Sequence, residues 1–284
     1  MALIPTFFPD CVVAIGTYAN SEMPVWLASG FFYGYRVSPE NSDDAKYRVF
    51  LVTNRHVFDG LSAACVRVNP EADEPARVYN LDLQDKQGKT LWRSHPRSEV
   101  DLAVVPVNFS LLKEELMQAA FFTSDKHSAS IDKMIELGIC EGDFAYVLGF
   151  PMALVGDKRN AVIVRGGSIA RIRDTLAKAN SEFLVDAFIF PGNSGGPVIS
   201  KPEVVAIKGT KSQNSAYLIG VVKSYVPYQD VAVSRQTGQP RVIFEENSGL
   251  TAAHPIDYID EVIEEHLKTK ADLPEPESTP PQEP

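Results

Sequence analysis

Short runs of β-branched and aromatic residues, separated by turn residues, recur along most of this chain. Runs of about four to eight such residues, bounded by Gly, Pro, Asn or Ser, are typical of β-strands. The segments of this kind are 11–16, 25–37, 47–53, 64–68, 76–83, 90–92, 99–107, 144–148, 161–164, 167–173, 183–190, 197–200, 204–207 and 217–226. So many short strands, with turns between them, predict a β-sandwich or a β-barrel.

A different spacing appears toward the end of the chain. Pro255 suits the first turn of a helix, and the apolar residues after it recur every three or four positions. They are Ile256, Ile259, Val262, Ile263 and Leu267. This spacing predicts an amphipathic helix over residues 255–268 that packs on the β framework, and segments 111–120 and 131–137 predict two shorter helices. Residues 271–284 are rich in Pro and Glu and lack aromatic residues, which predicts a disordered tail.

Composition and charge narrow the class of protein. The 284 residues are 44% hydrophobic, enough for one large or two small domains with real cores. A net charge of -10 argues against nucleic acid and anionic membranes as partners. The chain has no apolar run long enough to span a bilayer, and its N-terminal residues lack the basic start and apolar core of a secretory signal. We therefore expect a cytoplasmic protein.

The three cysteines fit the same compartment. Cys11, Cys65 and Cys140 are odd in number, lie in apolar surroundings and lack the spacing of metal ligands. This pattern favours reduced, buried thiols over a disulfide framework. No ligand spacing suggests a metal or an organic cofactor, and we expect neither.

One glycine-rich stretch carries candidate chemistry. Residues 191–198 read Pro-Gly-Asn-Ser-Gly-Gly-Pro-Val and follow an apolar, strand-like run. Glycines let the backbone turn sharply and bring its N–H groups to close range. If Ser194 is a nucleophile, the N–H groups of Gly192 and Ser194 are the natural donors to the oxyanion that forms when Ser194 attacks a carbonyl.

A nucleophilic serine needs a base and a carboxylate that orients the base. Among five histidines, only His56 ends an apolar strand; the others lie in polar segments or, as His254 does, directly before a proline at the expected start of the terminal helix. The carboxylates considered for the third role are Asp59, Asp82, Asp85, Asp101 and Asp186. Asp101 heads a hydrophobic strand, where burial of a carboxylate is costly without a partner. The alternative for Asp101 is a strand-end residue that caps local amides.

At this point three motifs in the order His, Asp, Ser carry a family resemblance. They are Thr-Asn-Arg-His-Val at 53–57, Val-Asp-Leu-Ala-Val at 100–104 and the serine loop at 191–197. The chain resembles the trypsin-like (chymotrypsin-fold) serine peptidases and is most similar to the HtrA/Deg-type peptidase domain. Further matches are the segments 28–31, 148–151, 185–187 and 253–256, so that the resemblance covers roughly residues 10–267.

The resemblance implies an all-β fold of two six-stranded antiparallel β-barrels. The peptidase domain would span residues 1–270, with an N-terminal barrel at about 10–120 and a C-terminal barrel at about 140–250. His56 and Asp101 would belong to the first barrel and Ser194 to the second, with the active site between them. The implied activity is that of a serine endopeptidase that forms an acyl-enzyme on a protein or peptide substrate and needs no cofactor.

A specificity pocket is implied by position. Phe188 and Ile189 would line its floor, and Val222, Lys223 and Ser224 its wall. An apolar pocket favours an aliphatic or small residue before the cleaved bond. The segment 218–226 would also pair with an extended substrate through backbone hydrogen bonds.

The departures from the family shape the alternatives. Asn193 replaces the aspartate that pairs with a new N-terminus in digestive members, so we expect no zymogen switch. The residues after Leu267 are too few and too rich in proline for a PDZ domain, so we expect none. The alternative is a trypsin-fold binding module that is idle or is opened by a regulatory partner, and an esterase would use the same residues. No oligomeric state is predicted.

Overall fold

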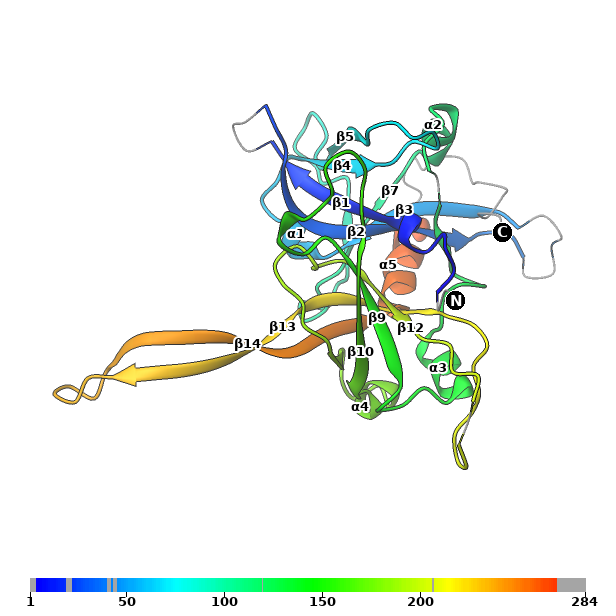
Figure 1. Cartoon of the computed structure of the whole chain (residues 1–284). Coiled ribbons are helices and arrows are strands. Elements are labelled where there is room, and N and C mark those ends of the chain that lie inside the picture. Colours follow the sequence, from blue (N-terminus) through cyan, green and yellow to red (C-terminus); the bar gives the residue numbers. More distant parts are fainter. Residues whose placement is uncertain are drawn as a thin grey trace.

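The computed structural model describes residues 4–18, 22–39, 42, 45–118, 120–205 and 207–269. β-Strands dominate these residues, and the helices are short except for the last one. The strands form two units that follow one another along the chain, an open sheet and a closed barrel (Figure 1). The predicted all-β fold class is thereby confirmed. The first unit differs from the predicted barrel because its sheet is open. The predicted tail at 271–284 lies outside the described residues.

The first unit is an eight-stranded sheet. Its strands are β1 (Val12–Thr17), β2 (Val25–Arg36), β3 (Tyr47–Thr53), β4 (Ala63–Val68), β5 (Arg77–Asp82), β6 (Arg93–Ser94), β7 (Ala103–Pro106) and β8 (Phe122–Thr123). Their order is β5-β4-β1-β2-β3-β7-β6, and β8 pairs in parallel with β2. The inner faces carry large apolar side chains, such as Phe31 and Phe50, which are fully buried.

This sheet is a half-barrel in its hydrogen bonding. In the described residues β5 pairs with no strand other than β4. β7 ends at Pro106, although the next N–H, that of Val107, still donates to Val49 O at 3.0 Å, and the chain then leads into α2 (Phe109–Glu114). An apolar cavity of about 170 Å³ lies between β5 and this segment, lined by residues that include Tyr79, Leu81 and Leu112. Helix α2 therefore lies where hydrogen bonds between the two ends of the sheet would close it into a barrel.

The second unit is the predicted six-stranded barrel. It consists of β9 (Phe144–Gly149), β10 (Ile163–Arg171), β11 (Phe183–Asp186), β12 (Pro197–Ser200), β13 (Leu218–Val233) and β14 (Pro240–Pro255), closed in the order β10-β11-β14-β13-β12-β9. The expected strand at 204–207 is wrong for the residues described there, because Val204 and Val205 lie in an exposed loop without strand neighbours. β13 and β14 run well past the barrel and form a two-stranded arm (Figure 1).

The helices close and connect the two units. They are α1 (Arg55–Phe58), α2, α3 (Ile131–Leu137), α4 (Arg173–Leu176) and α5 (Asp257–Lys268), with single 3-10 turns η1 (Pro9–Cys11) and η2 (Pro151–Ala153). The predicted terminal helix is confirmed as α5. The helix expected at 111–120 is displaced to α2, and Leu116 with φ of 55° follows its end. None of the helices in the described chain combines the length and apolarity that a membrane crossing requires.

Helix α5 follows the second barrel but contacts strands of the first sheet. Its Asp260 accepts a hydrogen bond from Tyr33 on β2 at 2.7 Å, and its Glu261 lies 2.8 Å from the ring Nε2 of His95. Ile259 and Ile263 are fully buried in a core cluster that also holds Phe31 from the first unit and residues of the second. Helix α5 therefore links the second barrel, which it follows in sequence, to the first sheet.

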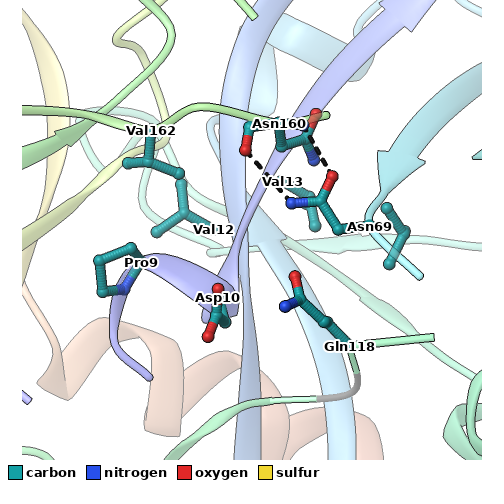
Figure 2. A pocket seen from close by; sticks show the side chains of 9 residues that line it. Pro9, Asp10, Val12, Val13, Asn69, Gln118, Asn160 and Val162 are labelled. Atoms are coloured by element: carbon teal, nitrogen blue, oxygen red, sulfur yellow. Dashed lines mark hydrogen bonds between the residues drawn. The ribbon is translucent and has the colours of Figure 1, made fainter. Parts of the chain in front are cut away.

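A second junction between the units is polar. Asn69, just after β4, and Asn160, just before β10, face each other beside a small cavity (Figure 2). The Asn160 N–H donates to Asn69 Oδ1 at 2.7 Å, and the Asn69 side chain donates to Asn160 O at 3.2 Å. Arg67 adds hydrogen bonds to Val155 O and Gly156 O. These contacts join the end of β4 to the segment that leads into β10.

The three cysteines are unpaired. Cys11 and Cys65 are buried, whereas Cys140 is half-buried. Burial, and then the nearby charge of Asp10, raises the pKa of the Cys11 thiol well above its ordinary value.

Candidate active site

The serine loop lies between β11 and β12 and is shaped by its glycines. Gly192 and Gly195 have φ of 102° and 80°, a region that favours glycine. A Cβ at Gly192 would stand 2.3 Å from Phe150 O, so no side chain fits there. The Pro191 carbonyl accepts from Met152 N at 2.6 Å, which holds the peptide before Gly192 in one orientation.

Ser29 on β2 ties this loop to the first unit. Its buried hydroxyl donates to Gly192 O at 2.7 Å and accepts from Phe150 N at 2.9 Å. Its main-chain N–H donates to Ser194 O at 3.0 Å. Ser29 thus contacts both predicted oxyanion residues from the other unit of the fold.

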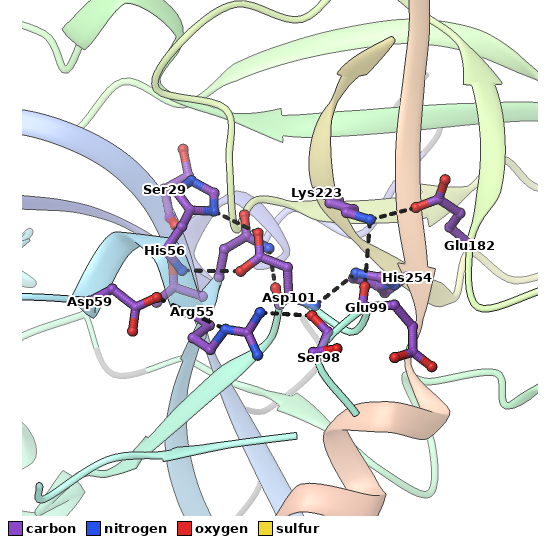
Figure 3. A network of polar contacts seen from close by, with 12 residues as sticks. Ser29, Arg55, His56, Asp59, Ser98, Glu99, Asp101, Glu182, Lys223 and His254 are labelled. Atoms are coloured by element: carbon purple, nitrogen blue, oxygen red, sulfur yellow. Dashed lines mark hydrogen bonds and ion pairs between the residues drawn. The ribbon is translucent and has the colours of Figure 1, made fainter. Parts of the chain in front are cut away.

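His56 and Asp101 are brought together as predicted from the sequence (Figure 3). His56 lies in α1, directly after β3, and its ring Nδ1 is 2.6 Å from Asp101 Oδ2. The His56 main-chain N–H donates to Asp101 Oδ1 at 3.0 Å. Burial raises the pKa of Asp101, but the hydrogen bonds and charge of His56 outweigh burial and hold the pKa below its ordinary value.

This pairing fixes the roles of the imidazole nitrogens. An ionised carboxylate only accepts hydrogen bonds, so the His56 nitrogen that faces Asp101 carries the proton. In the neutral imidazole, Nε2 is therefore the nitrogen with a free lone pair. The His56 side chain is 52% exposed, whereas that of Asp101 is 15% exposed. The imidazole is accessible from solvent and the carboxylate behind it is shielded.

The serine loop lies against the strand that leads to His56. A Cβ at Gly195 would stand 2.2 Å from the Thr53 hydroxyl and 2.4 Å from Ser29 O. The Thr53 hydroxyl itself donates to Ser29 O at 2.9 Å. Ser194 is half-buried, and among the described residues its hydroxyl makes no hydrogen bond to the His56 ring. The structure therefore brings the loop to the end of β3 without this last hydrogen bond.

Two N–H groups of the loop are left open. Asn193, Gly195 and Gly196 donate their N–H groups to Phe190 O, Val222 O and Asn193 O. Within the described part of the chain, neither the Gly192 nor the Ser194 N–H donates to another protein group. These are the two N–H groups that the sequence suggested for an oxyanion.

The five residues expected to form a specificity pocket have different surroundings. Ile189 and Val222 are buried in the core cluster of the second barrel. Phe188 is 53% exposed, and Ser224 is also exposed. Lys223 is half-buried, with its ammonium 2.8 Å from Glu182 Oε2. Exposed surface near the expected pocket thus comes from Phe188, Ser224 and part of Lys223, and the assignment of the pocket stays a prediction.

Asp101 has further partners beyond His56. The Asn54 side chain donates to Asp101 O at 2.7 Å, and the Asp101 N–H donates to His254 Nε2 at 3.0 Å. Sequence reasoning placed His254 at the start of the terminal helix, but it lies in β14 and is fully buried. Among the described residues, no three His, Cys, Asp or Glu side chains gather as a metal site would require.

A relative and a solved structure resemble this chain. A "Probable periplasmic serine endoprotease DegP-like" protein of Chlamydia pneumoniae is 26% identical over 191 residues, which are 66% of this chain and 30% of that protein. The match thus spans less than a third of the relative's length. The MamO protease domain from Magnetospirillum magneticum, in its apo form, is 15% identical with a TM-score of 0.46, over 90% of this chain and 97% of that one. The relative is named as periplasmic, and the cytoplasmic location expected for this chain stays a prediction.

The family follows from a longer stretch of sequence. Residues 28–207 match the family model of the trypsin-like peptidase domain. The matched stretch is more than half of the chain, and it includes Ser29, His56, Asp101 and the serine loop. With the half-barrel, the closed barrel and the junction between them, this match shows that the chain belongs to the trypsin-like peptidase domain family.

Proposed function

We propose that this chain is a serine endopeptidase that cleaves peptide bonds through an acyl-enzyme. Ser194 is the nucleophile, His56 the general base and acid, and Asp101 the residue that orients the imidazole. The observation that carries the proposal is the double hydrogen bond from His56 to the Asp101 carboxylate, at 2.6 and 3.0 Å. It leaves His56 Nε2 as the acceptor that a serine hydroxyl needs.

The chemistry uses groups of this chain alone. His56 Nε2 takes the hydroxyl proton as Ser194 Oγ bonds to the substrate carbonyl carbon, and the open N–H groups of Gly192 and Ser194 bind the resulting oxyanion. His56 then gives the proton to the leaving amine when the peptide C–N bond breaks. A water molecule, deprotonated by His56, attacks the ester, and its proton returns to Ser194 as the acid product leaves.

The free edge of β13 supports an extended substrate. β12 pairs with β13 through Pro197, Val198 and Ile199, and the last of these partners along β13 is Val221. Beyond Val222, which bonds to the serine loop, β13 has only β14 beside it in the described residues. A peptide added to this edge would run past Ser194, which fits a protein or peptide substrate.

The alternative is a binding module opened by a partner. It is favoured by the missing hydrogen bond between Ser194 and His56 in the described structure. Such bonds are often long in enzymes without substrate, so the observation leaves the peptidase as the better-supported function.

Fluorophosphonate labelling of the purified protein tests the proposal. We expect labelling of the wild type and none of Ser194→Ala, with the site identified by peptide mass spectrometry. Hydrolysis of matched peptide and ester substrates then separates a peptidase from an esterase. Labelling only after addition of cell extract would support the gated alternative. A wild type that stays unlabelled, alone and with extract, would refute an active serine enzyme.

A further inference from the structure

His254 is a buried histidine that contacts the predicted triad from behind. It lies in β14 of the second barrel, and Figure 3 shows Asp101 between the His56 and His254 side chains. The Asp101 N–H donates to His254 Nε2 at 3.0 Å across 153 residues of sequence. The two histidines thus hold one aspartate from opposite sides, His56 through the carboxylate and His254 through the main chain.

The partners of His254 fix its protonation state. A main-chain N–H can only donate, so Nε2 accepts from Asp101 and carries no proton. The second ring nitrogen, Nδ1, is 2.8 Å from Ser181 O, and a carbonyl can only accept. Nδ1 therefore carries the proton, and the imidazole is neutral in this tautomer.

A second proton on the His254 imidazole is not compatible with these two hydrogen bonds. An N–H on Nε2 would face the Asp101 N–H, so protonation replaces a hydrogen bond by a contact between two donors. The Asp101 amide then loses its acceptor in a site where water has little access, since His254 is fully buried.

We propose that His254 is a positioning residue for Asp101, which holds the aspartate in register with His56 only while the His254 imidazole is neutral. The inference rests on the proposed function, because it assigns Asp101 the role of orienting His56. It adds a second histidine, outside the predicted triad, whose protonation switches the site off in acid.

Charged and aromatic side chains from several elements lie near His254. Lys223 on β13 is beside it and is ion-paired with Glu182, which precedes β11, and the Lys223 ammonium is 3.5 Å from Glu99 O. The ring of Tyr258 on α5 packs edge-on at 6.0 Å and carries the Arg97 guanidinium 4.7 Å from its centroid.

These groups shift the His254 equilibrium in opposite directions. Burial lowers the pKa of His254, and Lys223 lowers it further, whereas the hydrogen bond to Ser181 and the charges of Glu182 and Asp101 raise it; the net pKa lies below the ordinary value. The neutral form is therefore present at neutral pH and is lost as the pH falls below the ordinary histidine range.

Two substitutions separate positioning from simple packing. His254→Gln keeps one acceptor and one donor but cannot titrate, whereas His254→Phe keeps the ring and removes both polar atoms. In the labelling assay at pH 8, we expect His254→Gln within about 3-fold of the wild-type rate and His254→Phe slower by about 10-fold or more. His266→Gln, at a buried histidine on α5 that has no bond to Asp101, is the matched control and should leave the rate unchanged.

The pH profile supplies a readout that packing would not move. The wild-type labelling rate should fall more steeply in acid than that of His254→Gln, because the wild type has one further titrating imidazole, that of His254. Lys223→Met removes a nearby cation, so the loss of activity should begin at higher pH. Equal slopes in wild type and His254→Gln would overturn the proposal.

A spectroscopic measurement keeps this test separate from that of the proposed function. We expect the proton in the 2.6 Å hydrogen bond between His56 and Asp101 to give a downfield NMR signal whether or not the protein cleaves any substrate. In the Ser194→Ala background, we expect the signal to be retained in His254→Gln and shifted or lost in His254→Phe, with the folded state of each checked by methyl spectra. An unlabelled wild type with this pattern would refute only the peptidase. An unchanged signal in a folded His254→Phe protein would refute the positioning role.

Discussion

Asp101 is held by two hydrogen bonds from His56, one to each carboxylate oxygen. Both of its oxygens accept from His56, so any replacement must keep two acceptors to preserve the imidazole orientation. Asn offers one acceptor and one donor, and its NH₂ facing His56 Nδ1 forces the proton onto Nε2, the wrong tautomer for a base. We expect Asp101→Asn to reduce turnover about 10⁴-fold, measured as kcat on a peptide substrate or as the labelling rate. Asp59→Asn, at an exposed carboxylate 3.9 Å from Arg55, is the control. A near-normal rate for Asp101→Asn would move the orienting role to another aspartate.

The hydroxyl of Ser29 is the basis of a second prediction, which concerns stability and the serine loop. Ser29→Ala leaves the Phe150 N–H and the Gly192 carbonyl without a partner in a buried site. We expect a loss of about 1–3 kcal/mol in the free energy of unfolding, measured by urea denaturation, and slower labelling because the serine loop is less well held. Ser248→Ala removes an exposed hydroxyl that water replaces, and should cost less than about 0.5 kcal/mol. Equal effects of the two substitutions would contradict the anchoring role of Ser29.

Some of these residues could be predicted from the sequence and others could not, for a physical reason. His56, Asp101 and Ser194 stand in local motifs, each with a strand and a turn that can be read from neighbouring residues. Ser29 stands in one of the segments that match the family, but its role is not visible in the sequence because its partner Gly192 is 163 residues away. His254 looked like the start of a helix because Pro255 follows it, yet Pro255 ends β14 and the helix begins at Asp257. Roles that depend on contacts between distant segments leave no local pattern.

At the scale of elements, the arm of β13 and β14 is the largest difference from expectation. The sequence predicted a strand only up to residue 226, and Pro227, Asp230, Gly238 and Pro240 interrupt any strand pattern beyond it. In the structure the residues after 226 pair from Pro227 with Asn247 to Val233 with Pro240. Apolar side chains such as Val231, Ile243 and Phe244 are exposed on it, so burial does not impose the alternation that identifies a strand. By contrast, β13 up to Val222 is buried and was predicted.

The arm should be removable. Its outer strands pair only with each other in the described residues, and a lone two-stranded hairpin is marginally stable. We therefore expect replacement of residues 228–246 by Asn-Gly to leave the barrel folded, with a Tm change under about 4 °C. Pro227 and Asn247 pair across the new turn, and Asn247 keeps its 2.6 Å bond to Ile189 O.

Thermal unfolding followed by circular dichroism measures this change. Asn247→Ala with the arm intact is the comparison, and it should destabilise more than removal of the arm because it leaves the Ile189 carbonyl unpaired. A shortened protein that fails to fold, or whose Tm falls by more than about 10 °C, would show that the arm is part of the barrel's stable structure.

At the scale of the whole molecule, α5 joins the end of the chain to the first sheet. The periodicity of residues 255–268 predicted the helix and its apolar face, and Ile259, Val262 and Ile263 are buried as that face requires. The periodicity did not indicate which unit the helix covers, because an apolar face can pack on any other apolar surface. In the structure, two polar residues of the same helix contact the first unit: Asp260 accepts a hydrogen bond from Tyr33, and Glu261 pairs with His95. The double-barrel architecture was likewise implied by family resemblance, whereas strand periodicity alone left a sandwich and a barrel open.

The Asp260 contact makes the stability of the whole fold depend on pH. Burial, reinforced by the charges of Asp257 and Glu264, raises the pKa of Asp260 from 3.8 to about 7, although its hydrogen bond from Tyr33 lowers it. The native protein therefore holds a proton that the unfolded chain releases between about pH 4 and 7. Asp260 is neutral and costs nothing in the native state below this window, and the free energy of unfolding falls as the pH rises through it.

Asp260→Asn removes this titration and keeps an oxygen for the Tyr33 hydroxyl. We expect the variant to match the wild type near pH 4 and to become more stable by about 2–4 kcal/mol above pH 7, measured by urea denaturation across this range. Glu265→Gln, at an exposed carboxylate on the same helix, is the control, and its effect should stay within about 0.5 kcal/mol. Because other titrating groups are shared by wild type and variant, only the difference between them reports Asp260. A difference that does not change with pH would mean that burial does not raise the native pKa of Asp260 above that of the unfolded chain.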